Sequence, residues 1–158
     1  MREYDFAVQA QRCYIDGLNA GVAGFNTWCI HEMYYPGGSE PMRFGLWDFG
    51  TWDVRPIYHV VAALCRNTEP GDPVRKCVSS HEETVRAALA GNTLFWVNLA
   101  DRPVAVRVAG ASLKTVHAFD EGRVEDDRET GRLLPVEENA FEAPARSFGY
   151  GKTLSGKE

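Results

Sequence analysis

The sequence predicts an α+β fold in which a helix–strand–helix segment is followed by an antiparallel β-sandwich. Up to about residue 70, apolar side chains recur at helical spacing and aromatic residues are frequent. Beyond that point the chain breaks into short β-like runs separated by Gly, Asn, Asp and Pro. Between the two parts, residues 69–73 contain two prolines and a glycine, which end a helix and favour a turn. We therefore expect two domains, residues 1–70 and residues 71–158.

Two amphipathic helices are expected in the first domain. The first covers residues 5–19, with Asp5 as a suitable N-cap. Spacings of three and four define the stripe expected to face the core, which consists of Phe6, Ala10, Cys13, Gly17 and Leu18. The second helix covers residues 56–66, because Pro56 suits a first helical turn. The residues expected to face inward from it are Tyr58, Val61, Leu64 and Cys65.

A buried strand is expected between the helices, over residues 22–30. This run is mostly apolar, holds β-branched and aromatic members and lacks alternating polar residues, which is typical of a strand covered on both faces in a parallel sheet. A loop with two prolines and two glycines follows over residues 36–41. Helix, strand, loop and helix make only part of an α/β layer, because a single parallel strand has nothing to pair with.

The second domain is expected to be an antiparallel sandwich, because its β-like runs are short and regularly spaced. The charged residues 121–132 are expected to form a solvated hairpin loop, and residues 137–142 a second acidic edge. The expected strands cover residues 74–79, 84–89, 94–99, 104–108, 113–119, 133–136 and 145–150.

Length and charge exclude several classes of protein. A complete (β/α)8 barrel needs about 250 residues, and this sequence has 158. Its 17 basic and 22 acidic residues give a net charge of −5, which disfavours binding to nucleic acid or to anionic membranes. The longest uncharged run, residues 17–30, is too short to span a bilayer, and the charged N-terminus does not resemble a signal peptide. Localisation stays open.

No catalytic or metal-binding motif is found. The four cysteines show neither Cys-x-x-Cys nor zinc spacing and are expected to be buried thiols. His31-Glu32 resembles the start of a His-Glu-x-x-His zinc motif, but Tyr35 stands where the second histidine is required. Gly-x-Ser-x-Gly and P-loop patterns are also missing. We therefore assign no catalytic residue, no metal and no cofactor.

One aromatic segment could bind a sugar. It follows the expected strand, and sites in parallel α/β proteins lie at the carboxyl ends of strands. Aromatic rings can cover the C–H faces of a sugar, while imidazole and carboxylate groups bond its hydroxyls. Equally, Trp28 could be a core residue and the tyrosines could simply line a loop. The candidate binding residues are Trp28, His31, Glu32, Tyr34 and Tyr35.

Three stretches, at residues 17–28, 44–47 and 55–58, together resemble the end of a retaining (β/α)8-barrel glycoside hydrolase of the clan that includes cellulases and xylosidases. Residues 95–99 and 143–148 are similar to the β-sandwich that often follows such barrels. The resemblance implies that residues 22–30 are the eighth barrel strand. It also implies that Trp28 forms the floor of the sugar subsite and that residues 31–35 form the adjoining loop.

The resemblance further implies a missing catalytic pair. In this clan two glutamates lie at the ends of strands four and seven; strand four is absent here, and Glu3 lies too close to the first helix to match. We therefore expect the C-terminal portion of a glycoside hydrolase acting on oligo- or polysaccharide, inactive alone. Its expected partners are carbohydrate and the rest of a barrel, or a second copy bound through exposed apolar surface. The alternative is a non-catalytic carbohydrate-binding or structural sandwich, but only Phe95 and Trp96 are adjacent aromatics there.

Overall fold

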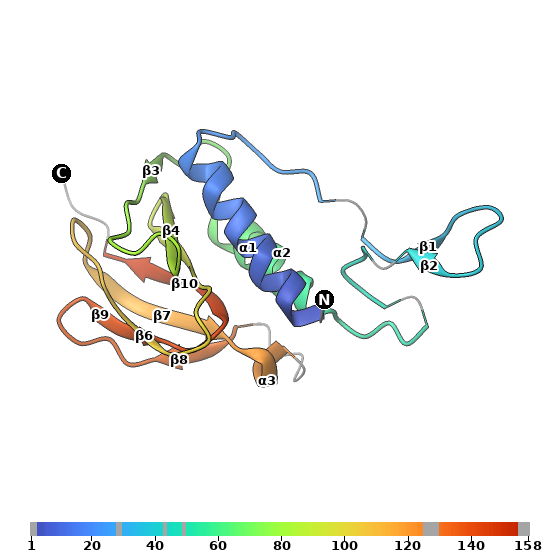
Figure 1. Ribbon diagram of the computed structural model, residues 1–158. Coiled ribbons are helices and arrows are strands. Elements are labelled where there is room, and N and C mark those ends of the chain that lie inside the picture. Colours follow the sequence, from blue (N-terminus) through green and yellow to red (C-terminus); the bar gives the residue numbers. More distant parts are fainter. Residues whose placement is uncertain (1–2, 28–29, 43, 49, 125–129, 155–158) are drawn as a thin grey trace.

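The computed structural model describes the chain except residues 1–2, 28–29, 43, 49, 125–129 and 155–158. A helical pair lies on one face of an antiparallel sheet, and a two-stranded ribbon covers the other face (Figure 1). In order, the elements are α1 (Glu3–Asn19), β1 (Met33–Tyr34), β2 (Pro41–Met42), α2 (Pro56–Asn67), β3 (Val74–Lys76), β4 (Val85–Ala90), β5 (Thr93–Asn98), β6 (Val104–Arg107), β7 (Leu113–Phe119), α3 (Glu121–Val124), β8 (Arg132–Leu134), β9 (Ala140–Ala143) and β10 (Ser147–Thr153).

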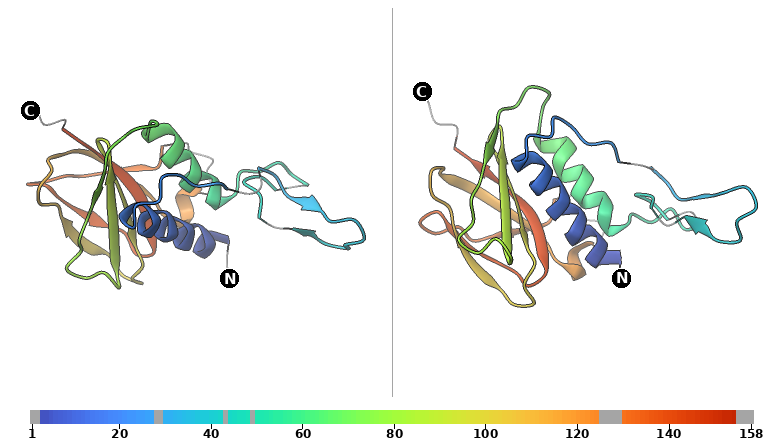
Figure 2. Two further views of the ribbon diagram at one scale, coloured as in Figure 1. Left: turned by 90° about the horizontal axis from the view of Figure 1, so that it is seen from above. Right: turned by 45° about the horizontal axis from the view of Figure 1, so that its top comes forward.

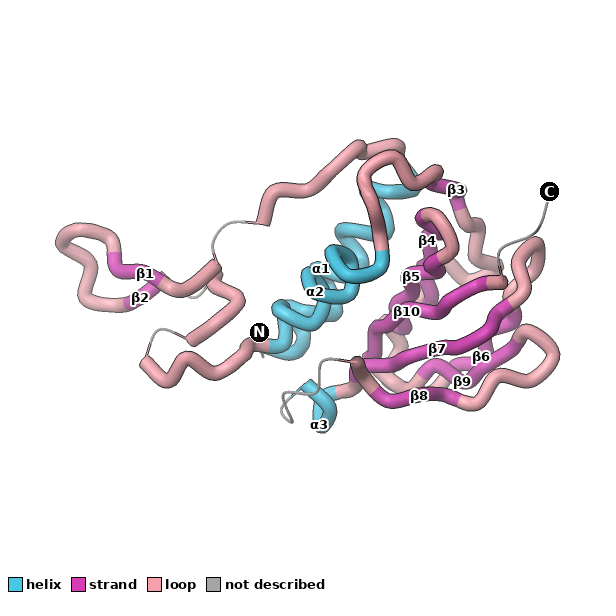
Figure 3. Tube along the Cα trace, turned by 180° about the vertical axis from the view of Figure 1, so that it is seen from behind, coloured by secondary structure: helices cyan, strands magenta, loops and turns pink. Residues whose placement is uncertain are grey.

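The main sheet has the strand order β3-β4-β5-β10-β7-β8, and every pairing is antiparallel (Figure 3). β10, the last strand, lies between β5 and β7, with Gly149 opposite Trp96 on one side and Ala118 on the other. A Cβ on Gly149 would clash with the backbone carbonyl oxygen of His117 on β7 and would lie 2.7 Å from the Trp96 ring, so glycine allows both β7 and the indole to approach β10 closely. The predicted α+β class with an antiparallel sheet is therefore observed, whereas no barrel is present in the described part of the chain.

α1 and α2 lie side by side on the sheet, and their buried side chains merge with those of β4, β5, β7 and β10 in one core (Figure 2). Two polar side chains fix α1 there. The Tyr4 hydroxyl lies 3.0 Å from the carbonyl oxygen of Phe119 and 2.6 Å from that of Arg146. The Gln11 amide donates to the carbonyl oxygens of Trp96 and Gly149. The helices of the predicted first domain and the sheet of the predicted second thus share a hydrophobic core, and the division at residue 70 stays a prediction.

The opposite face of the sheet packs against the β6–β9 ribbon. Trp96, which is fully buried, contacts Phe141 of β9 with ring centroids 5.2 Å apart. β9 lies where an acidic edge was expected; Phe141 and Ala143 are buried while Glu142 between them is exposed, as in a strand covered on one side. The short helix α3 lies in the expected hairpin loop, and residues 125–129 of that loop are outside the described residues.

The helices bury different faces from those predicted. α1 buries Tyr4, Ala7, Val8, Gln11 and Ile15, and α2 buries Ile57, His59, Val60 and Ala63. Five of the residues predicted to face inward are partly buried and packed against this core, namely Ala10, Leu18, Tyr58, Val61 and Leu64. Phe6, Cys13 and Cys65 are exposed. Each helix has apolar residues on two sides, so spacing alone cannot say which side meets the sheet. The expectation of buried cysteines is also wrong for Cys13 and Cys65, which are exposed, and Cys77 is half-buried; Cys29 lies outside the described residues.

The strand predicted at residues 22–30 is not formed by its described residues, and residues 28–29 lie outside the described part of the chain. Residues 22–27 form an irregular, largely exposed segment. Its Phe25 ring packs on α1, where a Cβ on Gly17 would lie 2.7 Å from it. A strand needs a neighbouring strand for its N–H and C=O groups, whereas the Val22 N–H bonds to the carbonyl oxygen of Gly17 in α1, and residues 22–27 pair with no strand among the described residues. None of the described helices combines the length and apolar character needed to cross a bilayer.

Candidate functional site

Residues 30–55 form an arm that extends away from the helices and the sheet (Figure 1). Its outer part is a two-stranded hairpin, in which Met33 pairs with Met42 and Tyr34 with Pro41. Its inner part is held by backbone bonds, from Leu46 N to Ile30 O and from Arg55 N to Leu46 O. The arm includes all the sugar-binding candidates except Trp28, which lies outside the described residues.

A buried ion pair attaches the arm to the helices. Arg55 directly precedes α2, and its guanidinium donates to the Glu32 carboxylate at 2.5 Å and to the Glu3 carboxylate at 3.1 Å. Glu32 is 2% exposed and Arg55 is 7% exposed, whereas half of the Glu3 side chain is in contact with solvent. Charged groups that deep in a protein require a partner. Arg55 therefore links the arm, the start of α2 and the start of α1.

Close backbone packing completes this attachment. A Cβ on Gly45 would meet the backbone of His31 and Glu32, so a larger residue would push the two parts of the arm apart. Trp47 follows on the same segment and contacts Tyr58 of α2, with ring centroids 5.2 Å apart. The base of the arm is thus a specific structure built on α2.

The structure separates the predicted binding residues into two groups. His31, Tyr34 and Tyr35 are exposed on the arm and can meet a ligand. Glu32 is buried and its carboxylate is bound by Arg55, and its bond to a sugar hydroxyl stays a prediction. The His31 ring bonds through Nδ1 to the Glu32 carbonyl oxygen at 2.7 Å. Because a carbonyl only accepts, Nδ1 carries the proton of the neutral ring.

Two further aromatics on the arm were not predicted as binding residues. Trp52 is 64% exposed and Phe44 is 52% exposed. The sequence gives a weak signal for them, because an exposed tryptophan in a turn cannot be distinguished from a buried one by spacing. In the described residues, every large aromatic that is substantially exposed lies between positions 6 and 52: Phe6, Phe25, Tyr34, Tyr35, Phe44 and Trp52.

The sheet offers no comparable aromatic platform in its described part. Phe95 and Trp96 are both buried, on the helix side and the ribbon side respectively. Tyr150 is also buried and stacks on His117 at 4.8 Å; burial raises the pKa of its hydroxyl. Among the described residues, the exposed aromatic rings therefore lie on α1, on the 22–27 segment and on the arm.

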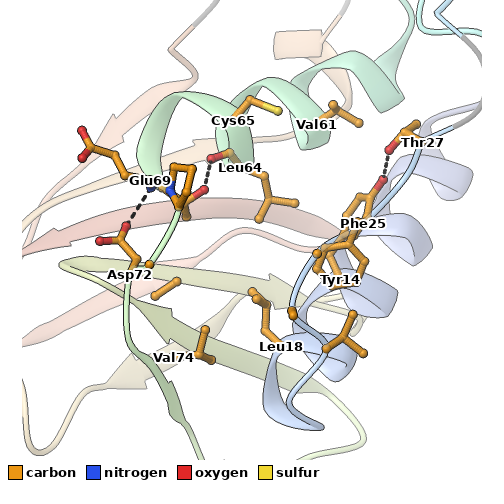
Figure 4. Close-up of a pocket in the computed structure, with 17 residues that line it drawn as sticks. Tyr14, Leu18, Phe25, Thr27, Val61, Leu64, Cys65, Glu69, Asp72 and Val74 are labelled. Atoms are coloured by element: carbon orange, nitrogen blue, oxygen red, sulfur yellow. Dashed lines mark hydrogen bonds between the residues drawn. The ribbon is translucent and has the colours of Figure 1, made fainter.

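A cleft of about 460 Å³ lies between the two helices, the 22–27 segment and the turn before β3 (Figure 4). Its wall is mainly apolar, with Leu18 and Val61 among the lining residues. The Tyr14 hydroxyl and Thr27 Oγ1 lie 2.5 Å apart at one side, and Asp72 accepts a bond from the Glu69 backbone at the other. The described residues include no group of three or more His, Cys, Asp or Glu side chains that could hold a metal ion.

Comparison with known proteins gives a fold and no family. No family model matches the chain, and no curated protein matches it. Among solved structures, the chain is similar to the glycoside hydrolase family 30 subfamily 8 xylanase Xyn30A from Clostridium acetobutylicum, with a TM-score of 0.67 and 15% identity over 96% of this chain and 39% of that chain. It is also similar to a GH30 endoxylanase from Clostridium papyrosolvens C71, with a TM-score of 0.61 and 14% identity over 94% of this chain and 38% of that chain. The chain thus spans less than two fifths of either xylanase, and identity this low establishes the fold alone.

Proposed function

We propose that this chain is the C-terminal portion of a glycoside hydrolase, that its arm contributes part of a wall for an oligo- or polysaccharide, and that it is inactive alone. The match to part of two family 30 xylanase chains supports the fold side of this proposal. The observation that carries it is the second apolar face of the α1–α2 pair. Phe6 of α1 is 40% exposed, and so is Phe25, which packs on α1 from the 22–27 segment and lines the apolar cleft.

In a (β/α)8 barrel, an apolar helix face of this kind packs against the barrel strands. Its helices form an outer ring around the strands, so each helix must present an apolar side to them. In this chain α1 and α2 already bury one side on the antiparallel sheet, and the remaining apolar side is the one that barrel strands would cover. Residues 22–27 would then be completed as a strand by neighbouring strands supplied from outside the chain.

The alternative, in which the sheet itself binds carbohydrate, is less well supported. A sugar-binding face requires accessible rings, and both Phe95 and Trp96 are buried. A purely structural role would leave the exposed tyrosines of the arm without a ligand. We therefore place the carbohydrate at the arm.

Sugar binding is tested by recording NMR amide shifts of the ¹⁵N-labelled chain during titration with xylohexaose and with cellohexaose. We expect shifts concentrated in residues 30–55, and a weaker response in the double variant Tyr34→Ala/Tyr35→Ala. Leu133→Ala, a change at an exposed apolar residue of β8, is the matched control and should leave binding unchanged. Shifts confined to the sheet strands would favour the alternative.

Hydrolysis and association test the remaining parts. With an aryl xyloside as substrate the chain should give no turnover, and measurable hydrolysis would contradict the proposal of missing catalytic groups.

Sedimentation velocity over a range of concentrations should show self-association through the uncovered face. Phe6→Gln/Phe25→Gln should weaken it, whereas Val78→Gln, at another exposed apolar side chain, should not. A monomer at all concentrations would argue against an uncovered barrel face.

A further inference from the structure

Trp52 has an unusual backbone conformation for its residue type. Its φ angle is +62°, in the left-handed region that bulky side chains rarely adopt. Its indole is 64% exposed, so burial of the ring does not compensate for this conformation. Backbone strain of this kind persists only where surrounding structure imposes it, and it concentrates at functional sites.

Asp48 imposes the conformation. One of its carboxylate oxygens accepts bonds from the backbone N–H groups of Gly50, at 2.8 Å, and Thr51, at 3.0 Å. These two bonds also hold the pKa of the Asp48 carboxyl below its usual value. The backbone of Asp48 bonds to Trp52 N–H and to the Asp53 carbonyl as well. The turn is therefore closed at both sides of Trp52, and its ring is presented outward.

The indole faces a second candidate residue. The centroids of the His31 and Trp52 rings lie 6.0 Å apart and the ring planes are inclined at 62°, so the two rings are neighbours without being stacked face to face. His31 is itself oriented by its bond to the Glu32 carbonyl, and Glu32 is held by Arg55. Both rings thus project from positions that are fixed to the base of the arm.

We propose that Trp52 is a saccharide-stacking residue, that His31 borders the same subsite, and that Asp48 positions the indole. The ligand class is an oligosaccharide of pyranose rings with equatorial hydroxyls, because such rings present the flat C–H faces that an indole can cover. This inference rests on the proposed function, since it places one ring of that saccharide. It explains why a strained, solvent-exposed tryptophan occupies a turn in which glycine or asparagine would fit without strain.

The test combines binding and stability of the full 158-residue chain. Binding of xylohexaose and cellohexaose is measured by isothermal titration, and folding by the thermal midpoint. Trp52→Asn removes the ring but accepts a positive φ, so we expect the thermal midpoint to stay level or rise while affinity falls by about ten-fold. Leu133→Asn, at an exposed apolar residue of β8 away from the arm, should leave affinity unchanged.

Asp48 is tested by a conservative pair of variants. Asp48→Ala removes the carboxylate that accepts the two backbone hydrogen bonds of the turn, and it should weaken sugar binding as much as Trp52→Asn does. The double variant Asp48→Ala/Trp52→Asn should bind no more weakly than Trp52→Asn alone. Asp48→Asn keeps an acceptor oxygen and should restore most of the affinity. If Asp48→Ala and Trp52→Asn act additively, the positioning role is overturned.

The remaining outcomes separate the two proposals. If the chain binds either sugar and Trp52→Asn binds equally well, the stacking role is overturned while the proposed function stands. If Trp52→Asn lowers the thermal midpoint and binding together, the indole is a packing residue and the stacking role is again overturned. If the unaltered chain binds neither sugar, the carbohydrate site on the arm falls, and the role of Trp52 falls with it.

Discussion

The contact between α1 and the sheet can be tested through one hydroxyl group, that of Tyr4. The ring is buried beside Phe148, and the hydroxyl can donate to the carbonyl oxygen of Phe119 or of Arg146. Burial raises the pKa of this hydroxyl well above its usual value, and the nearby acidic charge of Asp120 adds to the effect. Tyr4→Phe keeps the ring and removes only the proton donor.

The expected loss depends on pH in a defined way. At pH 7 the variant should be less stable by about 1 kcal/mol, the usual net contribution of a hydrogen bond. Above pH 10 the unfolded state of the unaltered protein releases the Tyr4 proton, whereas the folded state retains it. Because the pKa of Tyr4 is raised in the folded state, its contribution to the free energy of unfolding is complete below pH 10 and is lost as the pH rises above 10. At pH 11 the loss is about 1.4 kcal/mol.

The two proteins should consequently become equally stable at about half a unit above pH 10, and the variant should be the more stable at pH 11. Urea unfolding followed by far-UV circular dichroism at pH 7, 9, 10 and 11 measures the difference. Other titrating groups, including Tyr150, are common to both proteins and cancel. Tyr35→Phe, at an exposed tyrosine, should show no such crossing. A stability difference between Tyr4→Phe and the unaltered protein that stays constant across this range would refute the account of a locked, protonated Tyr4.

Two further changes test the arm and the sheet. Arg55→Ala leaves the Glu32 carboxylate buried without its guanidinium and should lower the free energy of unfolding in urea by about 3–5 kcal/mol. Glu3→Gln, at the exposed end of the same bridge, should lower it by less than about 1 kcal/mol. Equal losses would contradict the assignment of Glu32 as the main partner of Arg55. Gly149→Ala places a Cβ against the backbone carbonyl oxygen of His117 as well as 2.7 Å from the Trp96 ring, so the backbone of β10 must shift and the change should cost about 3 kcal/mol or more. Gly122→Ala, which meets nothing within 4 Å, should leave the thermal midpoint unchanged.

Local signals predicted the elements of the fold well where turns and caps mark them. α2 begins at Pro56 as expected, and β5 and β7 cover nearly the residues predicted for them. These elements depend on turn residues and on alternation within a few positions, which the sequence displays directly. β9 shows the limit of this approach, because the charge of Glu142 and its neighbours indicated an edge, whereas its pairing with β6 is a long-range contact.

The candidate site was only partly predictable for a similar reason. His31, Tyr34 and Tyr35 are exposed in the structure, although Tyr34 belongs to the short strand β1 and not to a loop; their role in binding stays a prediction. The burial of Glu32 depends on Arg55, which lies 23 positions later and is brought near by the fold. The exposed position of the Trp52 ring depends on the positive φ angle of this residue, which no sequence pattern predicts.

The largest disagreement between prediction and structure lies at residues 22–27 and at Ile30. An apolar run usually disappears into a core, yet Val22, Phe25 and Ile30 are 42%, 40% and 66% exposed. Exposing such side chains is unfavourable by about 25 cal/mol per Å² of apolar surface. On the helices, Phe6, Cys13 and Cys65 are likewise exposed although their spacing predicted burial. These exposed side chains support the proposal that strands from outside the chain cover them, and the association experiment with Phe6→Gln/Phe25→Gln tests it.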